Sequence, residues 1–212
     1  MGISKIDTRA NWAALNPTLL PGETGFESDT GNEKIGNGKS TWNKLEYFGS
    51  PGYFGDFSDE IDQTAAAVDT PYAVKFRLAD ADNHGVRVVS DSKITVEYPG
   101  VYTFVFMLQL TNNDSQIHDV NIWLRKNNAG AAGDLPMTDS KISVVESHGG
   151  VPGNVNGGLC HTLQLAKNDY IELIWATSDT NIFLNSTPAI TSPYSRPGSP
   201  SAGCTVCQIA AA

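Results

Sequence analysis

A ten-residue run near the middle of the chain constrains its fold most strongly. Residues 101–110 read VYTFVFMLQL, so bulky and lighter side chains alternate and both sets are largely apolar. A period of two residues is that of a β-strand, and a strand that is apolar on both faces is covered on both sides. The run therefore predicts a strand at the centre of a β structure or at a subunit interface.

Similar alternation fills the chain from residue 71 onward, with no helical period of 3.6 residues. The further strands are expected near 73–79, 93–98, 118–126, 140–146, 158–166, 169–177, 180–185 and 203–209. Charged residues, which helical surfaces need, make up only 17 % of the chain. We therefore predict an all-β sandwich or jelly roll of about eight to ten strands over residues 71–212.

Two of these strands carry a tryptophan at mid-length. Trp123 lies on the face opposite to Ile122 and Leu124, and Trp175 shares a face with Leu173. We interpret both as scaffold strands whose tryptophan fills a core or an interface.

Two shorter segments precede this domain. Residues 1–47 are rich in turns and predict a short β-hairpin, with Phe26 and Ile35 near each other across a turn at 29–32. Such a unit buries too little to be stable alone, so other copies or a docking partner must cover it. Residues 48–70, rich in Gly, Pro, Ser and Asp, are expected to form a linker or neck whose aromatic side chains pack on a neighbour.

The composition argues against several classes of protein. The formal net charge of −9 disfavours a nucleic-acid partner, which requires clustered Lys and Arg. No apolar run approaches the roughly 18 residues of a membrane span, and the N-terminus shows no signal-peptide core, so we expect no membrane insertion. Three cysteines make no disulfide framework. Cys204 and Cys207 face opposite sides of one strand, and we expect buried thiols there.

Candidate sites for chemistry are few. Residues 80–91, DADNHGVRVVSD, half-match a calcium loop, because Asp80, Asp82, Gly85 and Asp91 fit while His84 stands where Asp or Asn is expected. We favour a hairpin turn over a calcium site. The four histidines lie on separate elements without zinc spacing. The sequence shows no nucleophile elbow, phosphate-binding glycine loop or carboxylate pair. We therefore expect no catalytic, cofactor-binding or metal-binding residues, and not an enzyme.

The 71–212 region resembles the C1q/TNF-like jelly roll, especially its versions in tailed-phage virion proteins. The resemblance rests on four stretches in order: ITVEYPGVYTFVFMLQL, VNIWLRKNNA, LQLAKNDYIELIWATSDTNIFL and RPGSPSAGCTVCQIA. The chain departs from the family at Asn168–Asp169, where Gly-Asp is common, and at Cys204 and Cys207, where aliphatic residues are usual.

Residues 9–47 are similar to a short N-terminal module of phage tail-fibre and related appendage proteins. The matching positions are Asn11–Trp12, Asn16–Pro17, Gly22, Glu23, Gly25, Asp29–Gly31, Lys34–Gly36, Gly38, Trp42 and Leu45. The resemblance implies a trimeric docking module near the virion-proximal end, because three copies can bury what one cannot. We expect Trp12, Phe26 and Trp42 to hold this module together.

Together these resemblances imply a homotrimeric structural protein of a tailed-phage virion, assembled in the host cytoplasm. Its N-terminus would dock on another virion protein of tail or capsid, and its jelly-roll head would present loops to a host-surface glycan or protein. One apolar sheet face would form the trimer interface, with Val101, Tyr102, Val105 and Met107 as its candidates. The glycine-rich loop 146–158 is a long connection or a tip contact, and the proline-rich segment 185–203 is expected to pack around a neighbouring subunit.

Three alternatives remain at the level of sequence. The protein could be a capsid decoration that stabilises without binding a receptor. It could be a capsule-degrading depolymerase, although no carboxylate pair supports that activity. A cellular C1q-like binding module would need a signal peptide or a collagen-like stalk, and the sequence shows neither.

Overall fold

The computed structural model describes residues 5–48 and 52–211, and the chain divides into two compact units, residues 1–51 and 52–212. Each unit has its own hydrophobic cluster. We call the first unit the module and the second the head. No helix in the described part of the chain is long and apolar enough to cross a membrane.

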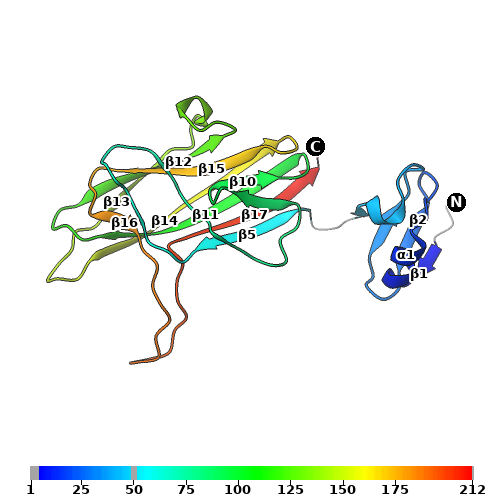
Figure 1. Ribbon diagram of the computed structural model, residues 1–212, viewed down its shortest axis with the longest axis horizontal. Helices are drawn as coiled ribbons and strands as arrows, with labels where there is room; N and C mark the ends of the chain where they lie inside the picture. The colour runs from blue at the N-terminus through cyan, green and yellow to red at the C-terminus, as the bar shows by residue number, and fades with distance from the viewer. Residues whose placement is uncertain (1–4, 49–51, 212) are drawn as a thin grey trace. The chain divides into compact units, whose positions relative to one another are not determined.

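The module is a four-stranded sheet with two short helical segments (Figure 1). Its elements are β1 (Lys5–Asp7), α1 (Arg9–Leu15), β2 (Thr24–Glu27), β3 (Glu33–Ile35), the 3₁₀ turn η1 (Trp42–Lys44) and β4 (Tyr47–Phe48). The sheet order is β1-β2-β3-β4, with β1 parallel to β2 and the other pairs antiparallel.

The hairpin predicted in the module is confirmed, with a shifted register. Strands β2 and β3 pair antiparallel around the predicted turn. Thr24 pairs with Ile35, and Phe26 pairs with Glu33, so Phe26 and Ile35 are diagonal neighbours on one face. The helix α1 was not predicted. Its N-cap Thr8 accepts a hydrogen bond from the backbone of Asn11, and its seven residues are too few to show a helical period.

The head is a β-sandwich, as predicted. Its elements are β5 (Phe54–Asp59), β6 (Gln63–Thr64), β7 (Tyr72–Ala73), β8 (Leu78–Ala79), β9 (Val86–Val89), β10 (Lys93–Val96), β11 (Gly100–Asn112), β12 (His118–Lys126), η2 (Ala131–Gly133), β13 (Ser140–Val144), β14 (Gly153–Leu165), β15 (Tyr170–Thr177), β16 (Ile182–Leu184) and β17 (Ala202–Ala211). One sheet runs β13-β12-β15-β10-β9, with β7 paired to β15. The other runs β6-β16-β11-β17-β5-β8, with β14 paired to β11.

The core of the head lies between the two sheets, and β11 is the central strand that its sequence predicts. Its bulky side chains, including Phe104 and Phe106, are buried inside. Trp175 and Leu173 of β15 fill the other side of the core. The alternation of β11 therefore assigns its bulky set to the sandwich and its lighter set to the outer face of the sheet.

The segment predicted as a linker at 48–70 is largely part of the head, apart from residues 49–51, which lie outside the described residues. Strand β5 pairs with β17 along six residues, and Phe57 is buried in the core. The prediction of a linker was wrong here because the inward positions of β5 are Gly55, Phe57 and Asp59. A single aromatic in that set gives little sign of a buried strand.

Residues 185–201 form a long protrusion between β16 and β17. Two isolated bridges, Thr187 with Ser199 and Ile190 with Arg196, hold its two arms together. Figure 1 shows this segment, in orange, extending away from the sandwich. It carries no regular strand, which agrees with the proline content that excluded a central strand.

Candidate docking and recognition surfaces

The core of the module is a pair of stacked tryptophans. The rings of Trp12 and Trp42 lie 4.2 Å apart between centroids at an interplanar angle of 15°, and Leu19 and Leu45 complete the cluster. The indole N–H of Trp12 donates to the backbone oxygen of Phe26 at 3.0 Å, which ties α1 to the sheet. Both tryptophans thus lie where the sequence predicts, whereas Leu19 was missed.

A buried charged pair supports this core from the sheet side. The Lys34 Nζ donates to the backbone oxygen of Trp42 at 3.1 Å and lies over the ring of Tyr47 at 4.2 Å from its centroid. Glu27 is fully buried and accepts from the hydroxyls of Thr30 and Tyr47. Burial lowers the pKa of Lys34, and burial with the Glu27 hydrogen bond raises the pKa of Tyr47 to about 12. Lys34 and Trp42, two of the motif positions, therefore have structural roles.

Phe26 does not belong to this core. Gly25, Glu27 and Lys34 face the tryptophans, so the alternation of β2 and β3 turns Phe26 to the opposite face. Its backbone serves the core through the Trp12 hydrogen bond, but its side chain is half-buried on the outside. Phe26 was predicted to hold the module together with Trp12 and Trp42, but its side chain lies on the face opposite to the tryptophan core.

The outer face of the module sheet carries an apolar row that we call the module stripe: Ile6, Phe26, Ile35 and Phe48. The register places Ile6 beside Phe26, Phe26 beside Glu33 and Glu33 beside Phe48, so the row crosses all four strands with the carboxylate of Glu33 in its middle. Ile6 is 66 % exposed and Phe48 is 62 % exposed. No described residue of the module covers this row. A small sheet with one face bare has the chemistry of a docking surface.

The outer face of the larger head sheet is the second apolar surface, which we call the head face: Phe54, Val105, Met107, Cys160 and Cys207. Val105 pairs with Cys160 on one side, and Thr103 pairs with Cys207 on the other, so these side chains share a face. Val105 is 47 % exposed and Met107 is 59 % exposed. Three adjacent long strands thus present a surface of small, mostly uncharged side chains.

Two predicted residues are corrected by this geometry. Tyr102, proposed for the trimer interface, is fully buried inside the sandwich, and its hydroxyl donates to the backbone oxygen of Tyr98 at 2.9 Å. Val101 is half-buried on the outer side with Val105 and Met107. Of the two thiols expected to be buried, Cys204 is buried and Cys207 is exposed. The sequence showed both sets of β11 to be apolar but did not tell which one faces the partner sheet.

The region that half-matches a calcium loop is a tight turn between the two sheets. Strand β8 pairs with β5 and β9 pairs with β10, so the turn carries the chain from one sheet to the other rather than closing a hairpin. The side chain of Asn83 bonds both the backbone N–H and the backbone oxygen of Asp56. Gly85 has a φ of +70° and packs against the ring of Tyr53.

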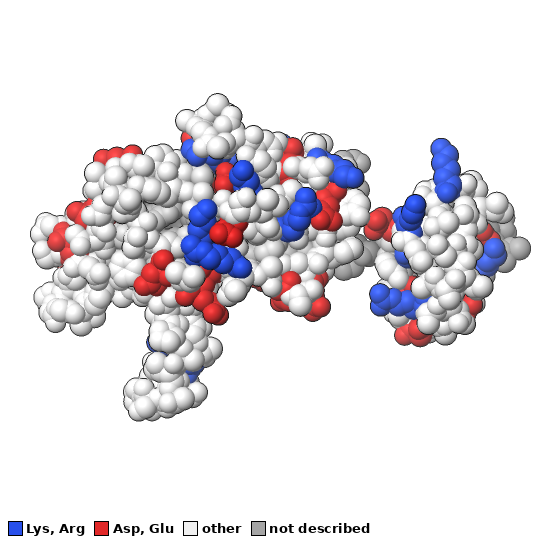
Figure 2. All heavy atoms as spheres, in the orientation of Figure 1, with Lys and Arg blue, Asp and Glu red and all other residues white. Residues whose placement is uncertain are grey.

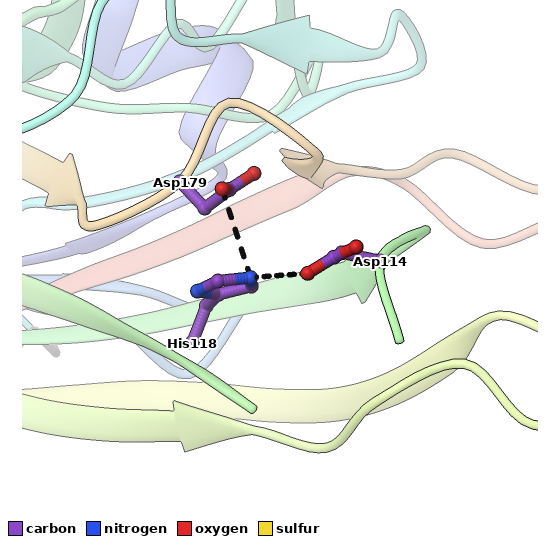
Figure 3. A group of neighbouring side chains, drawn as sticks. All are labelled: Asp114, His118 and Asp179. Carbon is purple, nitrogen blue, oxygen red and sulfur yellow. Dashed lines mark hydrogen bonds and ion pairs between the residues drawn. The ribbon is translucent and has the colours of Figure 1, made fainter. Parts of the chain in front are cut away.

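Sequence analysis missed one cluster of titratable groups at an end of the head (Figure 3). His118 Nε2 lies 2.7 Å from a carboxylate oxygen of Asp114 and 3.7 Å from one of Asp179. The hydrogen bond to His118 is the main cause that lowers the pKa of Asp114. These three residues meet because β11 and β15 end at the edge of the head where β12 begins. One imidazole and two carboxylates, with their ligand atoms within 4.8 Å of one another, are compatible with binding a divalent cation. The same three side chains also form ion pairs that link these loops without a metal.

Charges are spread over the molecule without a basic stripe on the face seen in Figure 2, where Lys and Arg alternate with Asp and Glu. Several are paired, such as Arg125 with Asp134 and Lys126 with Asp169.

Comparison with known proteins relates each unit to a different group. Residues 3–40 match the family model described as the major tropism determinant N-terminal domain. The hyaluronoglucosaminidase of Streptococcus pyogenes phage H4489A is 50 % identical over 40 residues, which are 19 % of this chain and 11 % of that protein. The chain therefore matches only about a tenth of the length of this curated relative.

The fold of the head has relatives among solved structures. The structure of Eiger TNF from S. frugiperda superposes with a TM-score of 0.50 at 14 % identity, covering 76 % of this chain and 95 % of the TNF chain. At that identity the likeness concerns the fold alone. The two comparisons together relate the chain to tail-fibre-type structural proteins of bacteriophages, with a tropism-determinant-like N-terminal domain followed by a C1q/TNF-like jelly roll.

Proposed function

We propose that the chain forms a homotrimeric appendage of a tailed-phage virion, which docks through the module and presents the head for host attachment. One observation carries the proposal: each unit exposes several large apolar side chains on one sheet face, the module stripe and the head face. Two such surfaces on one chain are more than a monomer in water normally exposes. A closed ring of three copies covers both without leaving an open edge for further assembly.

The head face is the stronger candidate for the interface between copies. Val105 and Met107 lie at its centre on the longest strands, and the glycines at 158 and 203 keep the surface flat. No Lys or Arg belongs to this face, as its register defines it. One carboxylate does lie on it, that of Asp56, which accepts from the Thr205 hydroxyl at 3.3 Å. A flat surface with an apolar centre and few charges is typical of an obligate interface.

The test is the solution mass of the chain and of matched variants by light scattering. The chain should have a mass near three times 22.7 kDa. Met107→Asp should reduce it to the monomer, because burying an unpaired carboxylate costs several kcal/mol. Val89→Asp places the same charge on a valine that is 41 % exposed on the other sheet and should remain trimeric. A monomeric parent chain would reject the trimer, and equal behaviour of both variants would reject the head face as its interface.

A role in host attachment is supported by the likeness of residues 3–40 to a tropism-determinant domain. Purified protein should then compete with phage for adsorption and reduce infection. Full infectivity at saturating protein would favour the alternative, a capsid decoration that only stabilises.

We further propose that the chain is not itself an enzyme, although a phage relative carries a hyaluronoglucosaminidase name. Two of the head glutamates have structural partners. Glu172 is buried and accepts from the Ser92 hydroxyl at 2.6 Å, and Glu97 pairs with Arg87. Incubation with hyaluronan or host capsule should release no reducing ends, and their release would overturn this proposal.

A further inference from the structure

A hollow of about 460 Å³ lies on the outer face of the smaller head sheet, away from the head face. Its floor is Asn121 and Trp123 of β12 with Ala176 of β15. Its walls are the segment at 69–71 and the loop at 134–139. Figure 1 shows the connection between β12 and β13, which contains this loop, standing off the sheet. The volume falls in the range of small-ligand sites.

The tryptophan in this floor has no part in the core. Ile122 and Leu124 point into the sandwich, and Trp123 points out. Its side chain hydrogen-bonds Asp134, which Arg125 also holds at 2.6 Å. The polar edge of the indole is therefore occupied and its orientation is set, so the apolar ring is what it offers to the hollow.

Carboxylates surround this ring. Asp139 accepts both hydrogen bonds that the Asn121 amide donates, at 2.9 and 3.1 Å. Asp69 is exposed on a backbone with a φ of +51°, and its carboxylate has no hydrogen bond or ion pair within the described residues. No Lys or Arg of the described chain lines the hollow. Arg125 pairs with Asp134 of this lining, so in the described part of the chain the carboxylates of the hollow without a cationic partner are those of Asp69 and Asp139, and its polar groups are mainly acceptors.

Met137 forms the outermost part of the wall. It is 96 % exposed, on a backbone with a φ of +62°, a conformation that costs free energy for a residue with a side chain. The loop therefore exposes the apolar side chain of Met137 at the hollow that Asp69 and Asp139 also line.

We propose that this hollow binds a non-anionic sugar unit of a surface glycan, and this inference rests on the proposed role in host attachment. A pyranose ring presents an apolar C–H face that packs on an aromatic ring, and its hydroxyl groups donate to carboxylates. A uronate or sialate is disfavoured because its carboxylate would meet Asp69 and Asp139 at short range. An amino sugar with a free ammonium group gains from the same charges.

The test is calorimetric titration of the full chain with four tetrasaccharides: cellotetraose, N-acetylglucosamine tetramer, glucosamine tetramer and a hyaluronan tetrasaccharide. At least one of the first three should bind, with a Kd of about 1 mM or below, and hyaluronan should not. Failure of all three to bind at about ten times that concentration overturns the inference, and so does binding of hyaluronan alone.

Two variants locate the binding. Trp123→Ala should weaken it at least about tenfold, since an anchor aromatic dominates a small site. Asp69→Asn should weaken it too, and this exposed carboxylate has no structural partner whose loss could unfold the head. Tyr194→Ala, an aromatic that is 64 % exposed on the protrusion, is the matched control and should change nothing. Equal effects of Trp123→Ala and Tyr194→Ala would reject the site.

The proposed role in host attachment is tested separately from sugar binding by the hollow. The variants should keep the trimeric mass, so each can be compared with the parent in both sugar binding and competition for adsorption. Sugar binding without competition for adsorption would support the hollow and reject the attachment role. Competition by Trp123→Ala at full strength would retain attachment and reject the hollow as its site.

Discussion

Gly25 shows how one residue of the module motif works. A Cβ built on it would lie 2.4 Å from the Trp42 ring and 3.2 Å from Leu19, so the stacked tryptophans need a glycine under them. The motif marks the position, but it does not say why a glycine is needed there. A glycine is needed because α1 and η1 pack closely against β2 at this position.

The first prediction concerns this position. Gly25→Ala should destabilise the module by about 1–3 kcal/mol, the usual cost of overpacking, and lower the fluorescence-detected melting temperature of its tryptophan core. Gly130→Ala, whose added methyl would meet its nearest neighbour at 3.7 Å, is the control for the change of residue and should have little effect.

Asp169 is the most connected carboxylate of the hairpin between β14 and β15. It accepts from the Asn127 amide at 2.6 Å and from the Ala166 backbone at 2.8 Å, and it pairs with Lys126 at 2.8 Å. Burial acts to raise the pKa of Asp169, but these hydrogen bonds outweigh it and leave the pKa lowered.

The second prediction follows from the sign of that shift. A lowered native pKa means that the Asp169 interactions add stability above the unfolded pKa of about 3.9, and that this stability is lost as pH falls through the lower native value. Asp169→Asn should therefore be less stable than the parent at pH 7 by about 1–2 kcal/mol. Urea unfolding at pH 7 and near pH 3 should show the difference shrink. A difference independent of pH would contradict this account.

At the scale of elements, β5 shows the clearest difference between prediction and structure, because it was predicted as part of a linker and is a strand of the head. Its inward residues include a glycine and a fully buried aspartate, Asp59, whose carboxylate pairs with Arg77 at 2.6 Å. An aspartate on the inner face breaks the apolar alternation that identifies a strand. The pairing with β17 supplies what the pattern lacks.

The third prediction tests whether β5 is part of the head core. Phe57→Ala should cost about 3–5 kcal/mol of stability, because Phe57 is 1 % exposed. Phe54→Ala, on the same strand but on the outer face, should cost under about 1 kcal/mol in the monomer. Chemical denaturation gives the free energy of unfolding of both variants. Equal decreases in that free energy would show that β5 does not belong to the head core.

The head face contains two cysteines whose reactivity can be measured. Cys160 and Cys207 are exposed on it, whereas Cys204 is buried on the inner side and burial raises the pKa of its thiol. Accessibility of these thiols therefore reports whether another copy covers the face.

The fourth prediction uses these thiols. In the native trimer Cys160 and Cys207 should react slowly with a thiol reagent such as Ellman's reagent, and in the Met107→Asp monomer both should react quickly. Cys204 should stay protected in both until the protein unfolds. Rapid labelling of Cys160 and Cys207 in a particle of trimeric mass would exclude the head face as the interface.

For the whole molecule, the separation into two hydrophobic clusters has a thermodynamic consequence. The head contains its entire core within residues 52–212, while the module relies on four buried apolar side chains. A core that small is marginal for an isolated unit.

The fifth prediction is that a chain reduced to residues 52–212 unfolds cooperatively with the same midpoint as the head in the full protein. Phe48→Asp, in the module stripe, should leave that midpoint unchanged and destabilise the module at any concentration at which the parent assembles. Circular dichroism of the shortened chain identifies the head transition, and the transition that only the full chain shows belongs to the module. Loss of the head transition on truncation would show that the units fold as one.

The sequence by itself determined the fold class, the central position of β11 and the two tryptophans of the module core. Alternation and motif residues are local properties, so they can be read along the chain. It did not reveal β5, whose inward residues are hardly apolar, nor the outward place of Phe26, which depends on the register with Glu33.

Only the tertiary structure decided which face of β11 is covered by the other sheet. It also decided which side chains from distant segments come together. Both sets are apolar, and the partner sheet selects the bulky one, which buries Tyr102 and leaves Met107 outside. His118 meets Asp114 and Asp179, and Trp123 meets Asp69 and Asp139 around the hollow, across separations of up to 61 residues (118 to 179). Such contacts arise from strand pairing and sheet packing between distant segments, and no local pattern encodes them.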